Sequence, residues 1–292
     1  MYESYYGLRE KPFNMTPDPR YFFASSKHAD ALNSLLYTIQ ERRGFAVITG
    51  EIGSGKTTIC RTLLGKLGTD TQAAVIRNTQ ITPKDLIHMT LEDLGAEFSL
   101  GTKVQLLSQL NGYLIEQLSR AVNVVLLIDE AQNLTPSVLE EVRMLSNLET
   151  DREKLIQILL VGQPELSEKL DSPQLRQFKQ RVAVHYHLPP LGRDEMQGYV
   201  EHRMKLAGAD GRVVFLSDAY DRMHAYTRGV PRLVNALADR SLLIGYVDET
   251  PAIGAGMVDE AAKDIPAIRD ADAEWSPSNG NGAKSHQPHG TS

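Results

Sequence analysis

The chain has 292 residues, a formal net charge of −6 and a hydrophobic content of 41%. This length accommodates one large domain or two modest ones, and the composition is ordinary for a soluble globular protein. The acidic balance argues against a protein whose main task is to coat nucleic acid, and the single cysteine, Cys60, excludes an internal disulfide framework and fits a reducing cytoplasm.

The first 27 residues are rich in aromatic residues and prolines. The prolines disfavour a long helix, and the aromatic side chains require burial. We therefore expect an ordered arm that packs on the domain following it. Ser26 is predicted to cap a helix over residues 27–42, in which apolar residues recur on one face.

Apolar strand-like runs then alternate with helical patterns. This alternation predicts an α/β fold over residues 28–190, with a parallel five-stranded sheet flanked by helices. The predicted strands are residues 45–49, 73–77, 124–128, 155–161 and 182–188, the last of them at a sheet edge. The predicted helices cover residues 58–64, 83–94, 104–120 and 136–148.

Two prolines at 189–190 end the alternation, and no strong strand candidate follows them. Helical patterns over residues 194–206, 217–227, 231–244 and 256–263 predict a small helical lid domain at 191–264. Aliphatic residues become sparse beyond it, so residues 265–292 are expected to be a disordered polar tail.

Residues 50–57 form a complete GxxxxGK[ST] pattern between a predicted strand and a predicted helix. Its glycines let the backbone curl so that N–H groups face phosphates, and the following helix adds its positive end. Lys56 is predicted to reach the β and γ phosphates of ATP, and the Thr57 hydroxyl to hold Mg²⁺. The predicted ATP-binding residues here are Gly50, Glu51, Ile52, Gly53, Ser54, Gly55, Lys56, Thr57 and Thr58.

Two acids, Asp129 and Glu130, follow the apolar strand at 124–128. Ligands of open α/β sheets bind at the carboxyl ends of the strands, so both carboxylates are expected beside the phosphates. Asp129 is predicted to order Mg²⁺ through water, and Glu130 to polarise the attacking water. A kinase acting on small molecules usually needs no such glutamate, because its nucleophile is the substrate.

A sheet domain with a helical lid and these motifs resembles the AAA+ family of ATPases. In that family a polar residue ending the fourth strand senses the γ-phosphate, and Gln163 matches its position. An arginine finger before the fifth strand reaches the γ-phosphate of a neighbouring subunit, and Arg181 and Arg176 both match. A planar guanidinium suits this bidentate contact. Arg181 is favoured, and the choice between the two stays open.

Two further positions follow from the same resemblance. Arg232 starts a lid helix in the sequence Gly-Val-Pro-Arg and resembles the sensor 2 arginine that closes the lid on the phosphates. A helix N-terminus disfavours a cation, and a nearby anion would resolve that conflict. Asn78 matches a position at which some AAA+ proteins carry an asparagine that holds the catalytic glutamate, here Glu130, away from water. An ordinary asparagine in a turn is an equally open interpretation.

Many ordered motifs resemble the general secretion pathway protein A (ExeA) family of AAA+ ATPases. The resemblance covers residues 1–264, and it is carried by the sequences YYGL, TPDPRYFF, TGE, DEAQ, LVGQPEL, QRV and GVPRLVN. Longer members continue into a transmembrane helix and a peptidoglycan-binding domain, whereas this sequence ends in a polar stretch. It therefore looks like the short relatives that serve pilus, secretion or exopolysaccharide systems.

The resemblance implies hydrolysis of Mg-ATP by a homo-oligomer, coupled to the operation of an export apparatus through a protein partner. The alternative is a DNA-associated AAA+ ATPase of the transposition-regulator type, which the acidic charge and the lack of a lysine or arginine block do not favour. A small-molecule kinase would need neither Arg181 nor Glu130. The N-terminus lacks the features of a signal peptide, and no stretch approaches about 18 apolar residues. We thus expect a cytoplasmic protein that reaches the inner membrane only through a partner.

Overall fold

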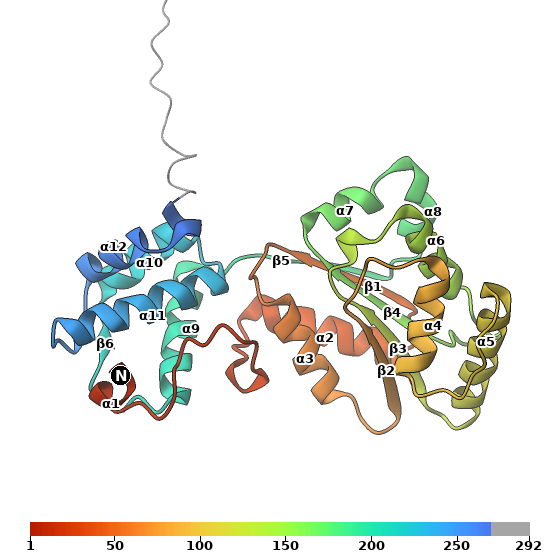
Figure 1. Ribbon diagram of the computed structural model, residues 1–292, viewed down its shortest axis with the longest axis horizontal. Coiled ribbons are helices and arrows are strands. Elements are labelled where there is room, and N and C mark those ends of the chain that lie inside the picture. The colour runs from red at the N-terminus through yellow and green to blue at the C-terminus, as the bar shows by residue number, and fades with distance from the viewer. Residues whose placement is uncertain (270–292) are drawn as a thin grey trace, which may run out of the picture.

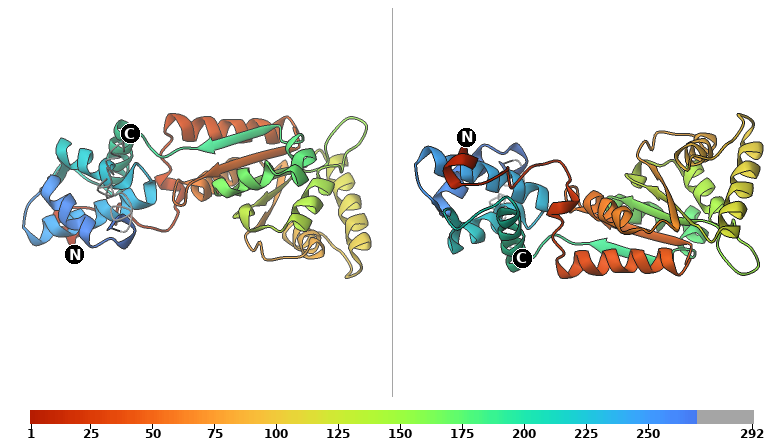
Figure 2. Two further views of the ribbon diagram at one scale, coloured as in Figure 1. Left: turned by 90° about the horizontal axis from the view of Figure 1, so that it is seen from above. Right: turned by 90° about the horizontal axis from the view of Figure 1, so that it is seen from below.

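The computed structural model describes residues 1–269 and shows an elongated molecule with two regions side by side (Figures 1 and 2). One region holds the large sheet with its helices, and the other is almost entirely helical. Each region has its own hydrophobic core. The division at residues 190 and 191 remains our proposal. Among the described helices, none combines the length and the apolar character needed to cross a bilayer.

The sheet has five parallel strands in the order β2-β3-β4-β1-β5, with β5 at an edge as predicted. The strands are β1 (Phe45–Gly50), β2 (Thr71–Ile76), β3 (Asn123–Ile128), β4 (Gln157–Gly162) and β5 (Val184–Leu188). All residues of the three inner strands are buried, which explains why they read as continuous apolar runs. β5 is shorter than predicted, since residues 182–183 precede the strand.

Helices cover both faces of the sheet, because alternate strand residues point to opposite sides. Ala46, Val125 and Leu159 face α2 and α3, whereas Val47, Leu126 and Leu160 face the core beneath α4, α5 and α6. The helices are α2 (Ser26–Gln40), α3 (Lys56–Lys66), α4 (Pro83–Asp93), α5 (Lys103–Ser119), α6 (Pro136–Leu145), α7 (Pro164–Leu170) and α8 (Arg176–Lys179). The cap of α2 differs from the prediction, because the Ser25 hydroxyl, not that of Ser26, accepts from the His28 N–H.

The helical region contains the four predicted helices and a small strand pair that the sequence analysis missed. Its elements are α9 (Arg193–Leu206), α10 (Ser217–Thr227), α11 (Pro231–Val247), α12 (Ala255–Lys263), β6 (Val214–Phe215) and β7 (Ala252–Ile253). Strands of two residues are too short for an alternating pattern to reveal them. Ile268 is buried in this core, so the prediction of a polar tail from residue 265 starts too early, and its part from 270 to 292 lies outside the described residues.

The N-terminal arm packs mainly on the helical region, so the expectation that it packs on the sheet domain is wrong for its first half. It opens with a short helix, α1 (Tyr2–Tyr6), which contacts α11 and lies in the helical region (Figure 1). Tyr6 is buried there, and its hydroxyl lies 3.2 Å from the carbonyls of Leu242 and Thr250. Phe22, near the end of the arm, packs against the core beneath α2 and α3. The arm thus joins the two regions.

Candidate nucleotide-binding site

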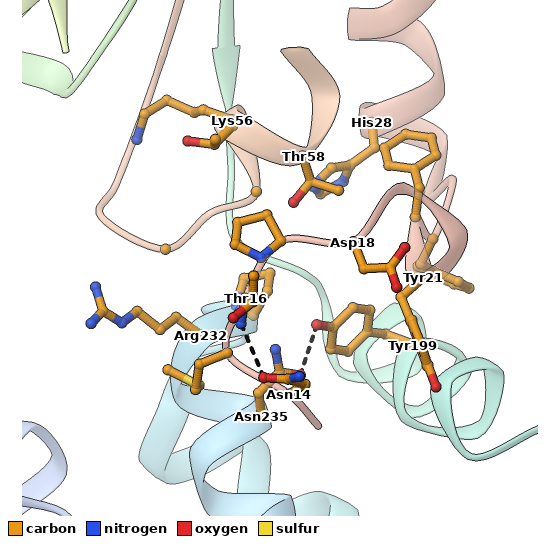
Figure 3. Close-up of a pocket in the computed structure, with 18 of the residues that line it drawn as sticks. Asn14, Thr16, Asp18, Tyr21, His28, Lys56, Thr58, Tyr199, Arg232 and Asn235 are labelled. Atoms are coloured by element: carbon orange, nitrogen blue, oxygen red, sulfur yellow. Dashed lines mark hydrogen bonds between the residues drawn. The ribbon is translucent and has the colours of Figure 1, made fainter. Parts of the chain in front are cut away.

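A cavity of about 430 Å³ opens where the two regions meet, at the carboxyl edge of the sheet (Figure 3). β4 lies between β1 and β3, so the segments following these three strands converge at this edge. We call residues 50–58 with Asp129, Glu130 and Gln163 the loop end of the cavity. Residues 14–23 of the arm, with Tyr199, Arg203 and Asn235, form its arm end.

The loop after β1 has the backbone geometry that a phosphate-binding loop requires. Gly53 and Gly55 have φ values of 81° and 101°, in the left-handed region that favours glycine. Gly55 is the N-cap of α3 and contributes no side-chain cap, which leaves the first N–H groups of this helix for a ligand. Thr58 and Ile52 line the cavity beside them.

Lys56 is held inside this loop. Its Nζ donates to the carbonyl oxygens of Gly50 at 2.7 Å and Glu51 at 2.9 Å, and the residue is buried. Burial lowers the pKa of the ammonium group, whereas the nearby carboxylates of Glu130 and Asp129 favour its charged form. The hydrogen bonds to the Lys56 ammonium that the described structure gives come from neutral carbonyl oxygens, so this buried positive charge is suited to an anionic ligand.

Asp129 lies next to Thr57, and the shared Mg²⁺ site of these two residues stays a prediction. Its Oδ2 is 3.5 Å from the Thr57 hydroxyl, and its Oδ1 accepts from the Glu130 N–H at 3.0 Å. Burial raises the pKa of this carboxyl group. A carboxylate and a hydroxyl beside a phosphate loop form an oxygen donor set that fits Mg²⁺, which takes few protein ligands and completes its shell with phosphate and water.

Glu130 lines the cavity. Its backbone φ is 53°, a left-handed value that is uncommon for residues other than glycine. Its Oε2 accepts from Gln132 Nε2 at 2.7 Å and from Gln163 Nε2 at 3.5 Å. Gln132 Oε1 in turn accepts from the Gln163 N–H at 3.1 Å. Gln163 therefore lines the cavity beside Glu130, and its sensing role stays a prediction. Gln132 was not predicted as a site residue, although it stands two positions after the catalytic candidate.

Arg232 brings the helical region onto the loop end. Its backbone N–H donates to the Gly53 carbonyl at 3.2 Å, and the residue lines the cavity. A Cβ atom at Gly53 would lie 2.4 Å from the Arg232 Cβ, so only glycine permits this approach. Figure 3 shows Arg232 and Asn235 across the cavity from Lys56 and Thr58.

The arm end is organised by Arg203, which the sequence analysis did not identify. This buried guanidinium donates to the carbonyl oxygens of Pro12 at 2.6 Å and Asn14 at 3.3 Å. It also donates to the Tyr199 hydroxyl, and its Cζ lies 4.6 Å from the centroid of the Tyr21 ring. Arg203 therefore ties the arm to α9 beside the cavity, through contacts between segments that are far apart in sequence.

His28 links the arm to the loop end. Its Nε2 lies 3.1 Å from the Ser54 carbonyl, and its Nδ1 lies 2.8 Å from the Ser25 hydroxyl. A carbonyl only accepts, so Nε2 carries a proton in this arrangement. Burial lowers the pKa of His28, which favours the neutral ring with Nδ1 accepting from Ser25. The sequence analysis did not identify His28 as a site residue.

The structure does not bring the two candidate finger arginines or Asn78 to the cavity. Arg176 starts α8 and Arg181 follows that helix, and both are exposed. Lys154 and, to a smaller extent, Arg181 lower the pKa of Glu149. Asn78 is exposed and its Oδ1 accepts from the Gln80 N–H at 3.2 Å, the arrangement of an asparagine in a turn.

Comparison with known proteins places these observations among related chains. Residues 39–170 match the AAA domain family. General secretion pathway protein A of Aeromonas hydrophila is 39% identical over 271 residues, which make up 92% of this chain and 49% of that protein. The chain thus spans about half the length of this relative.

Solved structures of low sequence identity share the fold. Cdc6p from Pyrobaculum aerophilum is similar with a TM-score of 0.65 at 19% identity, over 86% of this chain and 71% of that chain. The ORC2 protein of Aeropyrum pernix, solved as ADPNP–ADP complexes, has a TM-score of 0.63 at 15% identity, over 90% and 74% of the two chains. These similarities confirm the predicted fold class.

Proposed function

From the premise that this chain is an AAA+ protein related to general secretion pathway protein A, we propose that it binds and hydrolyses Mg-ATP. One observation carries the proposal. A buried lysine, a pair of adjacent carboxylates and a glutamine amide come from three segments, those after β1, β3 and β4, and meet beside one end of the cavity. We propose that hydrolysis serves the operation of an export apparatus through a protein partner, since the relative is named for secretion.

The loop end would hold the triphosphate. The N–H groups at the start of α3 and the Lys56 ammonium would bind its β and γ phosphates, with the lysine leaving the carbonyls of Gly50 and Glu51. The remaining volume of the cavity, towards the arm end, would take the nucleoside. Arg232 would approach the phosphates from the helical region, which offsets the unfavourable helix dipole at its position.

Thr57 and Asp129 would hold Mg²⁺, which neutralises charge on the phosphates when it is bound. Glu130 would orient the attacking water and accept its proton, since its carboxylate lines the cavity. Gln163 would donate to a γ-phosphate oxygen from the strand end between the loop and the two acids.

Arg181 would complete the site of a neighbouring copy. Its exposure and its position outside the cavity are compatible with a guanidinium that acts in a second subunit. Arg176 is the alternative from the same segment, and it is exposed too. We therefore propose a homo-oligomer whose assembly depends on ATP.

The test of hydrolysis compares the parent with Glu130→Gln in ATP binding and phosphate release. The variant should bind Mg-ATP with the parent's affinity and hydrolyse it at least about 100-fold more slowly, because the amide accepts no proton. Normal turnover in Glu130→Gln would remove Glu130 from the mechanism. An absence of ATP binding in both proteins would overturn the proposed function itself.

The test of the shared site uses Arg181→Ala, which should bind ATP and lose on the order of 10³-fold or more in hydrolysis. Mixing it with Lys56→Ala should restore part of the activity, since one variant supplies an intact pocket and the other an intact finger. Activity per chain should rise with protein concentration. Flat activity together with parent-like hydrolysis by Arg181→Ala would contradict the shared site, and Arg176→Ala then tests the alternative.

A further inference from the structure

Gln132 has no role in the mechanism so far, and yet it makes the shortest contact to the Glu130 carboxylate that the described structure gives. We propose that Gln132 is the positioning residue that holds Glu130 in its working orientation and couples it to the end of β4. The proposal rests on the proposed ATP hydrolysis, and it adds a residue that acts on the water only through Glu130.

The Gln132 side chain is fixed at both ends of its amide. Its Nε2 donates to Glu130 Oε2 at 2.7 Å, and its Oε1 accepts the Gln163 N–H at 3.1 Å. A Cβ atom on Gly162 would lie 2.9 Å from that Oε1, so β4 closes tightly over the amide. The Gln132 carbonyl also accepts from Lys169 of α7. The amide is therefore a bridge between two strand ends and not a freely rotating surface group.

The carboxylate that this bridge holds has little other support. Glu130 stands on a left-handed backbone, and Gln163 Nε2 reaches the same oxygen only at 3.5 Å. Lys56 and Asp129 are charged groups near Glu130, and their Coulombic interactions with its carboxylate do not fix the direction in which that carboxylate points. With Oε2 bonded to Gln132, the other oxygen, Oε1, is the one that can turn to a water in the cavity.

Binding of a γ-phosphate would change the hydrogen bonds around Glu130. A γ-phosphate oxygen would compete with Glu130 for the Gln163 side-chain amide, since both are acceptors. The contact at 3.5 Å is the weaker of the two, whereas the Gln132 bridge uses the Gln163 backbone N–H and would persist. Glu130 would then keep its orientation while Gln163 changes partner. In this chain Gln132, and not Asn78, contacts the glutamate.

The magnitude of the effect follows from geometry. A misplacement of about 1 Å at a catalytic group can cost on the order of 10²-fold in rate. Gln132→Met keeps the length and bulk of the side chain and removes both amide bonds. Asn133→Ala, an exposed position next to it, is the matched control. Parent, Glu130→Gln, Gln132→Met and Asn133→Ala are assayed together for ATP affinity, kcat and thermal unfolding.

We expect Gln132→Met to lose about 10- to 100-fold in kcat with ATP affinity changed by less than about threefold, because the bridge touches Glu130 and not the phosphates. Asn133→Ala should match the parent. A kcat within about twofold of the parent in Gln132→Met would overturn the proposal, as would a faster rate, which would mean that Gln132 restrains Glu130 from acting. Loss of activity in Asn78→Ala but not in Gln132→Met would return the role to Asn78.

A pH profile separates positioning from a merely structural role. In Gln132→Glu the new carboxylate faces that of Glu130. Repulsion between the two carboxylates raises the pKa at which the pair loses its last proton. Below that pKa the pair shares a proton and the bridge to Glu130 re-forms, whereas above it the two charges repel. The ratio of the variant's kcat to the parent's should therefore rise as the pH falls, while the ratio for Gln132→Met stays flat. Flat ratios for both would overturn the proposal.

The same assay keeps two failures apart. If Glu130→Gln loses hydrolysis and Gln132→Met does not, the bridge is wrong and the proposed function stands. If Glu130→Gln hydrolyses ATP like the parent, the proposed mechanism fails before Gln132 is considered.

Discussion

The two ends of the cavity are built in different ways. The loop end consists of one continuous segment, residues 50–58, and of single residues that directly follow β3 and β4. The arm end requires residues 14–23 together with α9 and α11, which come more than a hundred positions later in the chain and meet the arm through Arg203, Tyr199 and Asn235. Local sequence therefore specifies the first end, and tertiary packing specifies the second.

The two ends also differ in what their polar groups do for the fold. At the arm end, a buried guanidinium, a tyrosine hydroxyl and an asparagine oxygen satisfy one another with the arm carbonyls, so that the network stabilises the contact between segments. At the loop end, burial disfavours the charged forms of Lys56 and Asp129. The loop end thus contains buried charged groups whose burial costs stability, as expected of groups that serve the proposed ligand.

Lys56→Ala should give the largest effect and acts on the loop end alone. Without the ammonium group, both ATP and inorganic tripolyphosphate should bind at least about 100-fold more weakly, because a point charge on the β and γ phosphates is gone. Titration calorimetry with both ligands measures this. Lys66→Ala, exposed near the end of the same helix, should leave both affinities unchanged. Parent-like affinity and turnover in Lys56→Ala would remove the phosphate-loop assignment.

Arg203→Met should separate the two ends. The methionine fills much of the space but cannot bond to the Pro12 and Asn14 carbonyls, so the arm loses these two attachments to α9. We expect ATP to bind about 10-fold more weakly and tripolyphosphate to bind as before, together with a loss of about 2 kcal/mol in stability. Calorimetry with the two ligands and denaturant unfolding measure these effects. Lys205→Met, exposed on the same helix, is the control.

Equal weakening of ATP and tripolyphosphate binding in Arg203→Met would show that the arm end acts on the phosphates. That outcome would abolish the distinction between the two ends, because one change would then reach both.

The same distinction explains what the sequence could predict. The parallel sheet, its edge strand and the predicted helices of both regions follow from apolar periodicity and from proline and threonine at helix starts, and the structure agrees with them to within a few residues, whereas α1, α7 and α8 were not predicted. The residues of the loop end belong to spaced motifs with a chemical reason for each position. Their predicted roles still await experiments.

Other features had no local signal. Nothing near Arg203 indicates that its partners are carbonyls some 190 positions earlier in the chain. The burial of Tyr6 against α11 likewise depends on packing between distant segments, so aromatic content predicted an ordered arm but not its partner. Gln132 could have been inferred, since its place two residues after Glu130 allows its side chain to turn back, but only the position of β4 shows what holds its other end.

The smallest change in stability is expected for Asp129→Asn, which should give a protein that is inactive and yet more stable. Burial raises the pKa of Asp129 above its ordinary value of 3.8, so the folded chain binds this proton more tightly than the unfolded chain. The stability contributed by the protonated group is fully present below the unfolded pKa and is lost as the pH rises through the folded pKa. Asparagine carries no charge at any pH, so the variant should melt at a higher temperature than the parent at neutral pH without nucleotide or Mg²⁺.

Thermal melts across the acidic range should show this advantage shrinking as the pH falls, and Asp151→Asn, at an exposed position, should show no such trend. A variant that melts below the parent at neutral pH would mean that Thr57, Lys56 and the Glu130 N–H stabilise the carboxylate by more than its burial costs, and the loop end would then resemble the arm end in stabilising the fold.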